Sequence, residues 1–240
     1  MDSMVNHYTA NKHLRSDDAY SPNHQPGLRP DYPSIVYAKI LKELFPEVPV
    51  VLGGIEASLR RLAHYDYWQD RLRPGILADS PADLLIYGMG EKPICELARL
   101  LKQGIPFQTI RDIPQTAYIT PHHEPVGTED IRLFSFEECL KDKRKQAQNF
   151  RIIEEESNKH EASRMIQQTG KRSIVVNPPY PPMTTAEIDA SFDLPYTRLP
   201  HPKYKDKVIP AYEMIKFSVN IHRGSSWRSE ERRVGKECRS

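Results

Sequence analysis

Long hydrophobic runs are missing from this chain of 240 residues, since no stretch reaches the eighteen or so apolar residues that a membrane helix needs. Cysteine is scarce as well, with Cys95, Cys139 and Cys238 lying far apart. Three scattered cysteines form no disulfide framework, and a reducing cytoplasm is therefore the expected setting. Residues 1–8 contain neither a basic end nor an apolar segment, so they do not have the pattern of a secretory signal.

An excess of charge of either sign is also absent. The chain has 34 basic and 32 acidic residues, a formal net charge of +2, and this small excess comes entirely from residues 225–240. The balance gives no reason to expect nucleic acid or a membrane surface as a partner. A small-molecule substrate of unknown identity is the remaining expectation, and the oligomeric state is not fixed by the sequence.

What is present begins with a helix and a buried strand. Apolar residues on one side of residues 34–45 predict a helix, which Pro46 and Pro49 bound. Residues 48–52 form a short apolar run with three valines, which is typical of a strand buried on both faces. Gly53 and Gly54 follow it and predict a tight turn.

A second unit repeats this order. Residues 83–87 predict a strand, Gly88-Met89-Gly90 a turn and residues 91–103 a helix that ends at Gly104. We expect this helix to bury the following apolar residues: Ile94, Leu97, Ala98 and Leu101. Strand, turn and helix in succession predict a parallel α/β sheet.

The two turns are weak candidates for a cofactor-binding site. In an open parallel sheet, ligands bind outside the carboxyl ends of the strands, which is where Gly53, Gly54, Gly88 and Gly90 are expected to lie. The second turn is not a dinucleotide fingerprint, because Pro93 occupies the place of the third glycine. The alternative is that both turns merely connect elements.

Between the two units lies a cluster of cationic and aromatic side chains, residues 59–68. Arg60, Arg61 and His64 are weak candidates for substrate binding, since two guanidinium groups can clamp a carboxylate or phosphate. The alternative is a surface helix whose arginines pair with Asp66 and Asp70. The sequence identifies no catalytic residue and no metal ligand.

The second half of the chain is predicted to be a connector. Ser135 and Glu138 form a capping box that opens a predicted helix over residues 135–168, followed by a strand over 173–176. Many of the 21 prolines lie between residues 178 and 210 and predict an extended segment, interrupted by a short helix that Thr184 and Glu187 cap. The apolar, β-prone residues 214–221 predict a further buried strand.

That last segment, residues 208–224, closely resembles the lead-in to the cluster loop of YgiQ-type radical S-adenosylmethionine proteins. Residues 53–68, 177–182 and 194–202 also match strings of this family. In the family, Arg-Gly is followed by Cys-x-x-x-Cys-x-x-Cys, whereas Gly224 is followed here by Ser225-Ser226-Trp227. The resemblance implies a 4Fe-4S cluster and S-adenosylmethionine as cofactors of the intact family member, and none for this chain.

The resemblance also implies an architecture. Strands ending in Gly-Gly and Gly-x-Gly-Glu resemble the cobalamin-binding-like, Rossmann-like domains that precede many radical S-adenosylmethionine barrels, but the Asp-x-His-x-x-Gly pattern of cobalamin binders is absent, so cobalamin is not supported. We therefore expect an α/β fold with a long connector helix and the first strand of a truncated barrel. Five parts are predicted: a poorly ordered start (1–30), part of an α/β domain (31–130), a helical and proline-rich connector (131–207), the start of the radical S-adenosylmethionine domain (208–224) and a non-native tail (225–240).

Three functions remain open from the sequence. The chain is interpreted as a fragment of a radical enzyme with an unassigned substrate, inactive as given because the cluster cysteines are missing. The alternative is a non-enzymatic α/β ligand-binding module that uses the Gly53–Gly54 and Gly88–Gly90 turns. The third is a structural fragment without activity of its own.

Overall fold

The computed structural model describes residues 7–159 and 161–219 of the protein. Its helices and 3₁₀ turns are η1 (Pro22–His24), α2 (Pro33–Leu44), α3 (Gly54–Leu59), α4 (Ile76–Asp79), α5 (Glu91–Lys102), η2 (Phe107–Thr109), α6 (Phe136–Lys141), α7 (Lys143–Ser157), α8 (Thr185–Phe192), η3 (Pro202–Tyr204) and α9 (Pro210–Ile215). Its strands are β1 (Val51–Leu52), β2 (His64–Asp66), β3 (Arg71–Arg73), β4 (Leu84–Ile86), β5 (Thr116–Thr120), β6 (Ile131–Arg132), β7 (Met165–Thr169) and β8 (Arg172–Val176).

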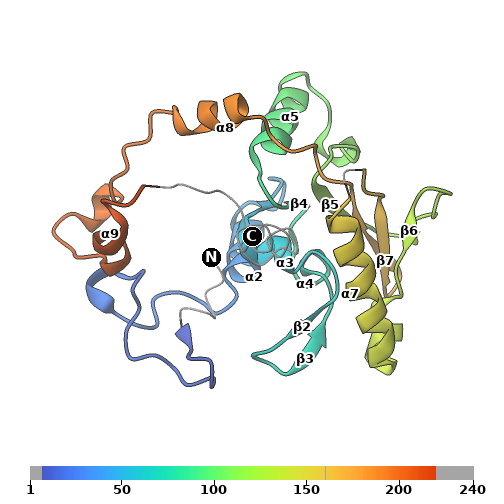
Figure 1. Cartoon of the computed structure of the whole chain (residues 1–240), viewed down its shortest axis with the longest axis horizontal. Helices are drawn as coiled ribbons and strands as arrows, with labels where there is room; N and C mark the ends of the chain where they lie inside the picture. Colours follow the sequence, from blue (N-terminus) through green and yellow to red (C-terminus); the bar gives the residue numbers. More distant parts are fainter. Residues whose placement is uncertain (1–6, 160, 220–240) are drawn as a thin grey trace, which may run out of the picture.

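Six of the strands form one mixed sheet in the order β1-β4-β5-β8-β7-β6 (Figure 1). The pairs β1–β4 and β6–β7 are parallel, and β4–β5, β5–β8 and β7–β8 are antiparallel. The predicted parallel alignment of residues 48–52 with 83–87 is thus confirmed, and so is the α/β fold class. The expectation of an entirely parallel sheet is wrong, because β5 runs antiparallel to β4 and reverses the direction of the sheet.

Apolar residues alternate between the two faces of this sheet. In β8, Ile174 and Val176 belong to one core cluster, together with residues of α2, α3 and α4, whereas Val175 belongs to a second cluster with Leu97 of α5. Such a period of two is what side chains on a strand dictate. The sheet is therefore covered by helices on both faces, and α5 lies on the face opposite α2, α3 and α4.

The first half of the sequence prediction is confirmed in its elements and corrected in its packing. The predicted helices over 34–45 and 91–103 correspond to α2 and α5. Of the four residues expected to be buried by α5, only Leu97 is, since Ile94 is 48% and Leu101 43% exposed. The helix instead turns Pro93, Leu97 and Leu100 toward the sheet.

The helix predicted over residues 135–168 is wrong beyond Ser157. Its capping box is confirmed, because Ser135 Oγ accepts from the backbone N–H of Glu138 and the Glu138 carboxylate accepts from that of Ser135. The chain then forms α6 and α7, and residues 165–169 form β7, which pairs with β8 along its whole length. Met165, Ile166 and Gln167 of this strand are buried, and they lie in the sheet rather than on a helix.

The C-terminal described segment returns to the N-terminal one. Residues 177–209 lead through α8 and η3 to α9, which lies beside the N-terminal segment and away from the six-stranded sheet (Figure 1). The N–H of Ala211 donates to the carbonyl of Ala19 at 2.8 Å, and that of Asn23 to the carbonyl of Val208 at 2.7 Å. Ala19 and Asn23 thus contact the residues around the start of α9, and the expectation that residues 1–30 are poorly ordered stays a prediction.

The strand predicted over residues 214–221 is wrong in its described part. Met214 and Ile215 close α9, and residues 216–219 form no strand. Pro210 explains the helix, because proline is favoured at the first helical position, where its missing N–H costs nothing. Residues 220 and 221 lie outside the described residues. Within residues 7–159 and 161–219, no helix is both long and apolar enough to cross a membrane.

Candidate functional site

The two glycine turns meet at one edge of the sheet. Since β1 and β4 are parallel, the turns that follow them open on the same side, and the N–H of Gly88 donates to Ser58 Oγ at 3.1 Å. Gly54 (φ +80°) and Gly88 (φ +66°) adopt the left-handed conformation that glycine allows without strain. The sequence prediction that both turns share one edge is confirmed.

The contacts at this edge connect protein to protein. The Gln115 side chain donates from Nε2 to the carbonyls of Tyr87, at 2.8 Å, and of Met89, and it lies against Gly88. Ser58 in turn donates to the carbonyl of Gly54 at 2.8 Å. Polar groups of both turns are thus satisfied by neighbouring elements, and this geometry favours the connecting role over the ligand-binding one.

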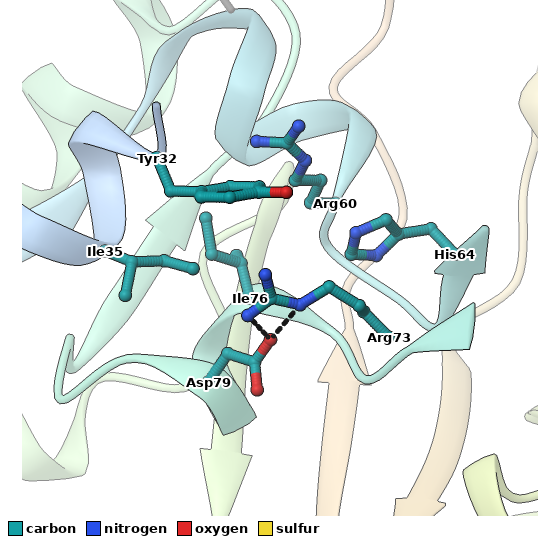
Figure 2. Close-up of a pocket in the computed structure, with 7 residues that line it drawn as sticks. All are labelled: Tyr32, Ile35, Arg60, His64, Arg73, Ile76 and Asp79. Carbon is teal, nitrogen blue, oxygen red and sulfur yellow. Dashed lines mark hydrogen bonds and ion pairs between the residues drawn. The ribbon is translucent and has the colours of Figure 1, made fainter. Parts of the chain in front are cut away.

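Arg60 belongs to a different cluster, which surrounds Tyr32 (Figure 2). The guanidinium groups of Arg60 and Arg73 lie on the Tyr32 ring, with their central carbons 5.2 and 5.0 Å from its centroid. The Tyr32 hydroxyl donates to Asp66 Oδ2 at 2.7 Å. Burial, followed by the hydrogen bond to Asp66, raises the pKa of Tyr32 to about 12. Tyr32 therefore remains a neutral phenol that two cations flank.

Both arginines of this cluster are neutralised within it. Arg60 Nη1 lies 2.8 Å from Glu56 Oε1, one turn earlier on α3, and both side chains are buried. Arg73 Nη2 lies 2.7 Å from Asp79 Oδ2 (Figure 2). The space between these side chains does not admit a water molecule. The cluster therefore joins the start of α2, α3, the β2–β3 hairpin and α4, and it leaves no room for a carboxylate or phosphate ligand.

His64 lies at the border of this cluster (Figure 2). Its Nδ1 is 3.1 Å from the carbonyl of Leu62, and since a carbonyl only accepts, Nδ1 carries the proton. Nε2 is buried and has no hydrogen-bond partner among the described residues. Burial lowers the pKa of His64, and the charges of Arg60 and Arg73 act in the same direction. The imidazole is consequently held neutral.

Arg61 points elsewhere. Its guanidinium lies over the ring of Tyr87, 4.9 Å from the centroid, and Nη1 donates to the carbonyl of Ser58 at 2.7 Å. Arg61 therefore faces the edge with the glycine turns, while Arg60 and His64 face Tyr32. The three substrate-binding candidates do not converge on one point. Arg60 forms an ion pair with Glu56, and its charge also contributes to the lowered pKa of Asp66.

The cysteines of the described segments do not fit an iron–sulfur cluster. Cys95 is exposed on α5, whereas Cys139 is buried in α6 and accepts a hydrogen bond from Asn149 Nδ2 at 3.2 Å. Burial raises the pKa of Cys139 to about 11, which disfavours the thiolate that an iron ligand requires. Cys238 lies outside the described residues. Within those ranges, no three His, Cys, Asp or Glu side chains group as metal ligands.

The sequence reasoning missed the partners of the arginines. Glu56 and Arg60 have the i, i+4 spacing of a helical ion pair, which was a usable signal. No comparable spacing points to Tyr32 or Asp79, because they reach the cluster from separate helices that only tertiary packing brings together.

The comparisons with known proteins agree with the family resemblance. The family described as "Radical SAM N-terminal" matches residues 1–218. UPF0313 proteins of Porphyromonas gingivalis and Bacteroides thetaiotaomicron are 67% and 63% identical to the chain, each over 93% of it, and one of Geobacter sulfurreducens is 49% identical over 93%. No solved structure matches. The chain belongs to the radical S-adenosylmethionine N-terminal family.

The match covers only part of these relatives. The aligned region accounts for 36% of the P. gingivalis protein, 38% of the B. thetaiotaomicron protein and 37% of the G. sulfurreducens protein. The chain thus corresponds to an N-terminal region and spans little more than a third of the length of the curated relatives it matches. The resemblance to YgiQ-type proteins is confirmed at the level of the family.

Proposed function

We propose that the chain is the N-terminal scaffold of a radical S-adenosylmethionine enzyme whose substrate is unassigned. The observation that carries this proposal is the family match over residues 1–218, together with relatives of which the aligned region makes up little more than a third. In the intact protein, a 4Fe-4S cluster and S-adenosylmethionine would be the cofactors. Because Cys95 and Cys139 do not fit the cluster, its ligands are assigned to the part of the relatives that follows the matched region, and no catalytic step is assigned to the described residues.

The contacts of the two glycine turns and of the Tyr32 cluster support the scaffold role. The contacts of Ser58 with Gly88 and of Arg60 with Glu56 connect one protein element to another, which agrees with a supporting domain. In this proposal the parallel β1–β4 pair with its two turns corresponds to part of a cobalamin-binding-like architecture, and cobalamin itself is not part of the proposal. A cytoplasmic setting, a small-molecule substrate and no nucleic-acid or membrane partner complete it.

Anaerobic reconstitution with iron and sulfide tests where the cluster ligands lie. We expect the chain alone to retain background iron and to show no broad cluster absorbance, because two described thiols at separate sites cannot replace three on one loop. The comparison protein is the full-length P. gingivalis relative in which this chain's residues 1–218 replace the matching segment. It should bind iron in stoichiometric amount. Stoichiometric iron in the chain alone that is lost on Cys95→Ala or Cys139→Ala would contradict the proposal.

A further inference from the structure

A groove of about 340 Å³ lies between α5, the loop after it and the segment that follows β8. Its apolar surface comes from Leu100, from the buried side chains of Ile110 and Ile113, and from the ring of Tyr180. A hollow of this size with apolar walls and a few polar groups is typical of small-molecule sites. The volume is sufficient for a molecule of roughly ten non-hydrogen atoms.

The groove is held open by a rigid frame that includes the Asn177–Pro182 motif. Asn177 Nδ2 donates to the carbonyls of Arg111, at 2.7 Å, and Ile113, at 3.0 Å. The N–H of Gln115 donates to the carbonyl of Pro178 at 2.7 Å. Prolines on both sides of Tyr180 restrict the backbone that positions its ring. The site is therefore formed before any ligand arrives.

The charged side chains at the rim of the groove differ in whether another side chain already contacts them. Glu96 is bound by Arg99 through two hydrogen bonds, at 2.6 and 3.0 Å. The guanidinium of Arg111 lies over the ring of Tyr118, 5.0 Å from its centroid. The exposed carboxylate of Asp112 forms no hydrogen bond or ion pair with the described residues. Asp112 is thus the charged group at the rim that has no such contact with another described side chain, so a cationic group of a ligand can reach it.

The surroundings of Tyr180 also include a carboxylate, that of Glu96. Burial raises the pKa of the Tyr180 phenol, and the carboxylate of Glu96 adds to the rise more than Arg99 opposes it. The face of an aromatic ring attracts a cation through its quadrupole, so the Tyr180 ring can contribute to the binding of an ammonium group.

We propose that this groove binds a small organic cation, with an apolar body against Leu100, Ile110 and Tyr180 and an ammonium group at Asp112. The site goes beyond the proposed scaffold role and does not depend on it, since none of its residues is assigned to the cluster.

The probe is 2-phenylethylammonium, titrated into the ¹⁵N-labelled full chain at low ionic strength, with 2-phenylethanol and 3-phenylpropanoate as neutral and anionic counterparts. We expect saturable amide shifts confined to residues around the groove and an affinity for the cation about three-fold above that for the alcohol, the size of one exposed ion pair. Asp112→Asn should remove this preference, while Asp206→Asn, a matched change at an exposed position outside the groove, should keep it. Tyr180→Leu should weaken all three probes by about five-fold through loss of the ring.

Three results would overturn the proposal. The first is the absence of saturable shifts at the groove for the ammonium probe up to tens of millimolar, which is the range expected for so small a ligand. The second is equal or tighter binding of the anionic probe, which would assign the charge recognition to Arg111. The third is an Asp112→Asn variant, folded by its amide spectrum, that keeps the preference for the cation.

Discussion

Gly75→Ala tests a position, just before α4, where the described structure leaves no room for a Cβ atom. A Cβ atom at position 75 would lie 2.5 Å from Ile174 Cδ1 and 2.7 Å from the carbonyl oxygen of Arg61. Ile174 is fully buried in β8, and the backbone of Arg61 cannot retreat as a flexible side chain would. The backbone of Gly75 (φ −59°, ψ 148°) suits alanine, so the effect isolates the steric clash.

The expected magnitude is a balance of two terms. Overpacking a close contact costs about 1–3 kcal/mol. Replacing glycine by alanine at a compatible φ recovers about 0.4–1 kcal/mol through the unfolded chain. The net loss of unfolding free energy is therefore about 1–2 kcal/mol, which for a protein of this size lowers Tm by roughly 2–8 °C.

Urea and thermal unfolding followed by circular dichroism would measure it. Gly90→Ala is the matched control, because a Cβ there meets its nearest atom, Ile86 Cγ2, at 3.5 Å and the backbone is helical. Gly90→Ala should change Tm by less than about 2 °C. Combining Gly75→Ala with Ile174→Val, which removes the clashing Cδ1, should cost less than the sum of the single changes. Equal Tm values for Gly75→Ala and Gly90→Ala would refute the close approach.

Three further predictions concern charged groups. Glu56→Ala leaves Arg60 buried without its carboxylate and should lower the unfolding free energy by about 3 kcal/mol, whereas Glu155→Ala, which breaks an exposed pair, should cost less than about 0.5 kcal/mol in the same urea titration. Burial lowers the pKa of His64 in the folded state, so on acidification the unfolded state takes up a proton at His64 at a higher pH than the folded state does. The stability that the neutral His64 ring contributes should therefore be fully present above about pH 6.5 and should fall as the pH drops below it. His64→Gln should flatten that part of the stability–pH curve, and an unchanged slope would contradict the burial of a neutral ring. The hydrogen bond from Lys145, followed by the Ser135 cap, lowers the pKa of Glu138 to about 2, so the stability that the Glu138 carboxylate contributes is present above about pH 4.5 and is lost toward pH 2. Because the Lys145–Glu138 pair is exposed, Glu138→Gln should lower the unfolding free energy by less than about 1 kcal/mol at pH 7. Thermal melts of both proteins at pH 7 and pH 3 measure this, since the difference between them should be smaller at pH 3.

The elements that the sequence predicted well are those that local interactions determine. The helix α5 and the capping boxes at Ser135 and Thr184 follow from residues within a few positions of each other, and all are present. The orientation of β5 and the strand β7 depend on partners far along the chain. β7 also contains Gln167, a buried polar residue whose amide bonds the N–H of Ala63 and the carbonyl of Phe134. No periodicity in the sequence reports such contacts.

The candidate site, too, was predictable where local sequence determines it and not where it depends on distant partners. The parallel β1–β4 pair placed both glycine turns at one edge, as the sequence indicated. Arg60 and Arg61 are adjacent in the sequence but face different surroundings, because α3 ends at Leu59 and the chain then turns toward β2. The groove at Tyr180 was not predicted, although its motif was noted, because it depends on the approach of α5 and the segment after β8.

The central claim, that the chain is a region of a radical enzyme, is tested most directly by reductive cleavage of S-adenosylmethionine. The assay uses the full-length P. gingivalis relative with this chain's residues 1–218 in place of its own, dithionite as the one-electron reductant and 5′-deoxyadenosine as the measured product. The account predicts product from this protein and background product from a version whose cluster-loop cysteines are alanines. Equal product from both, or none from a chimera that holds a full cluster, would contradict it.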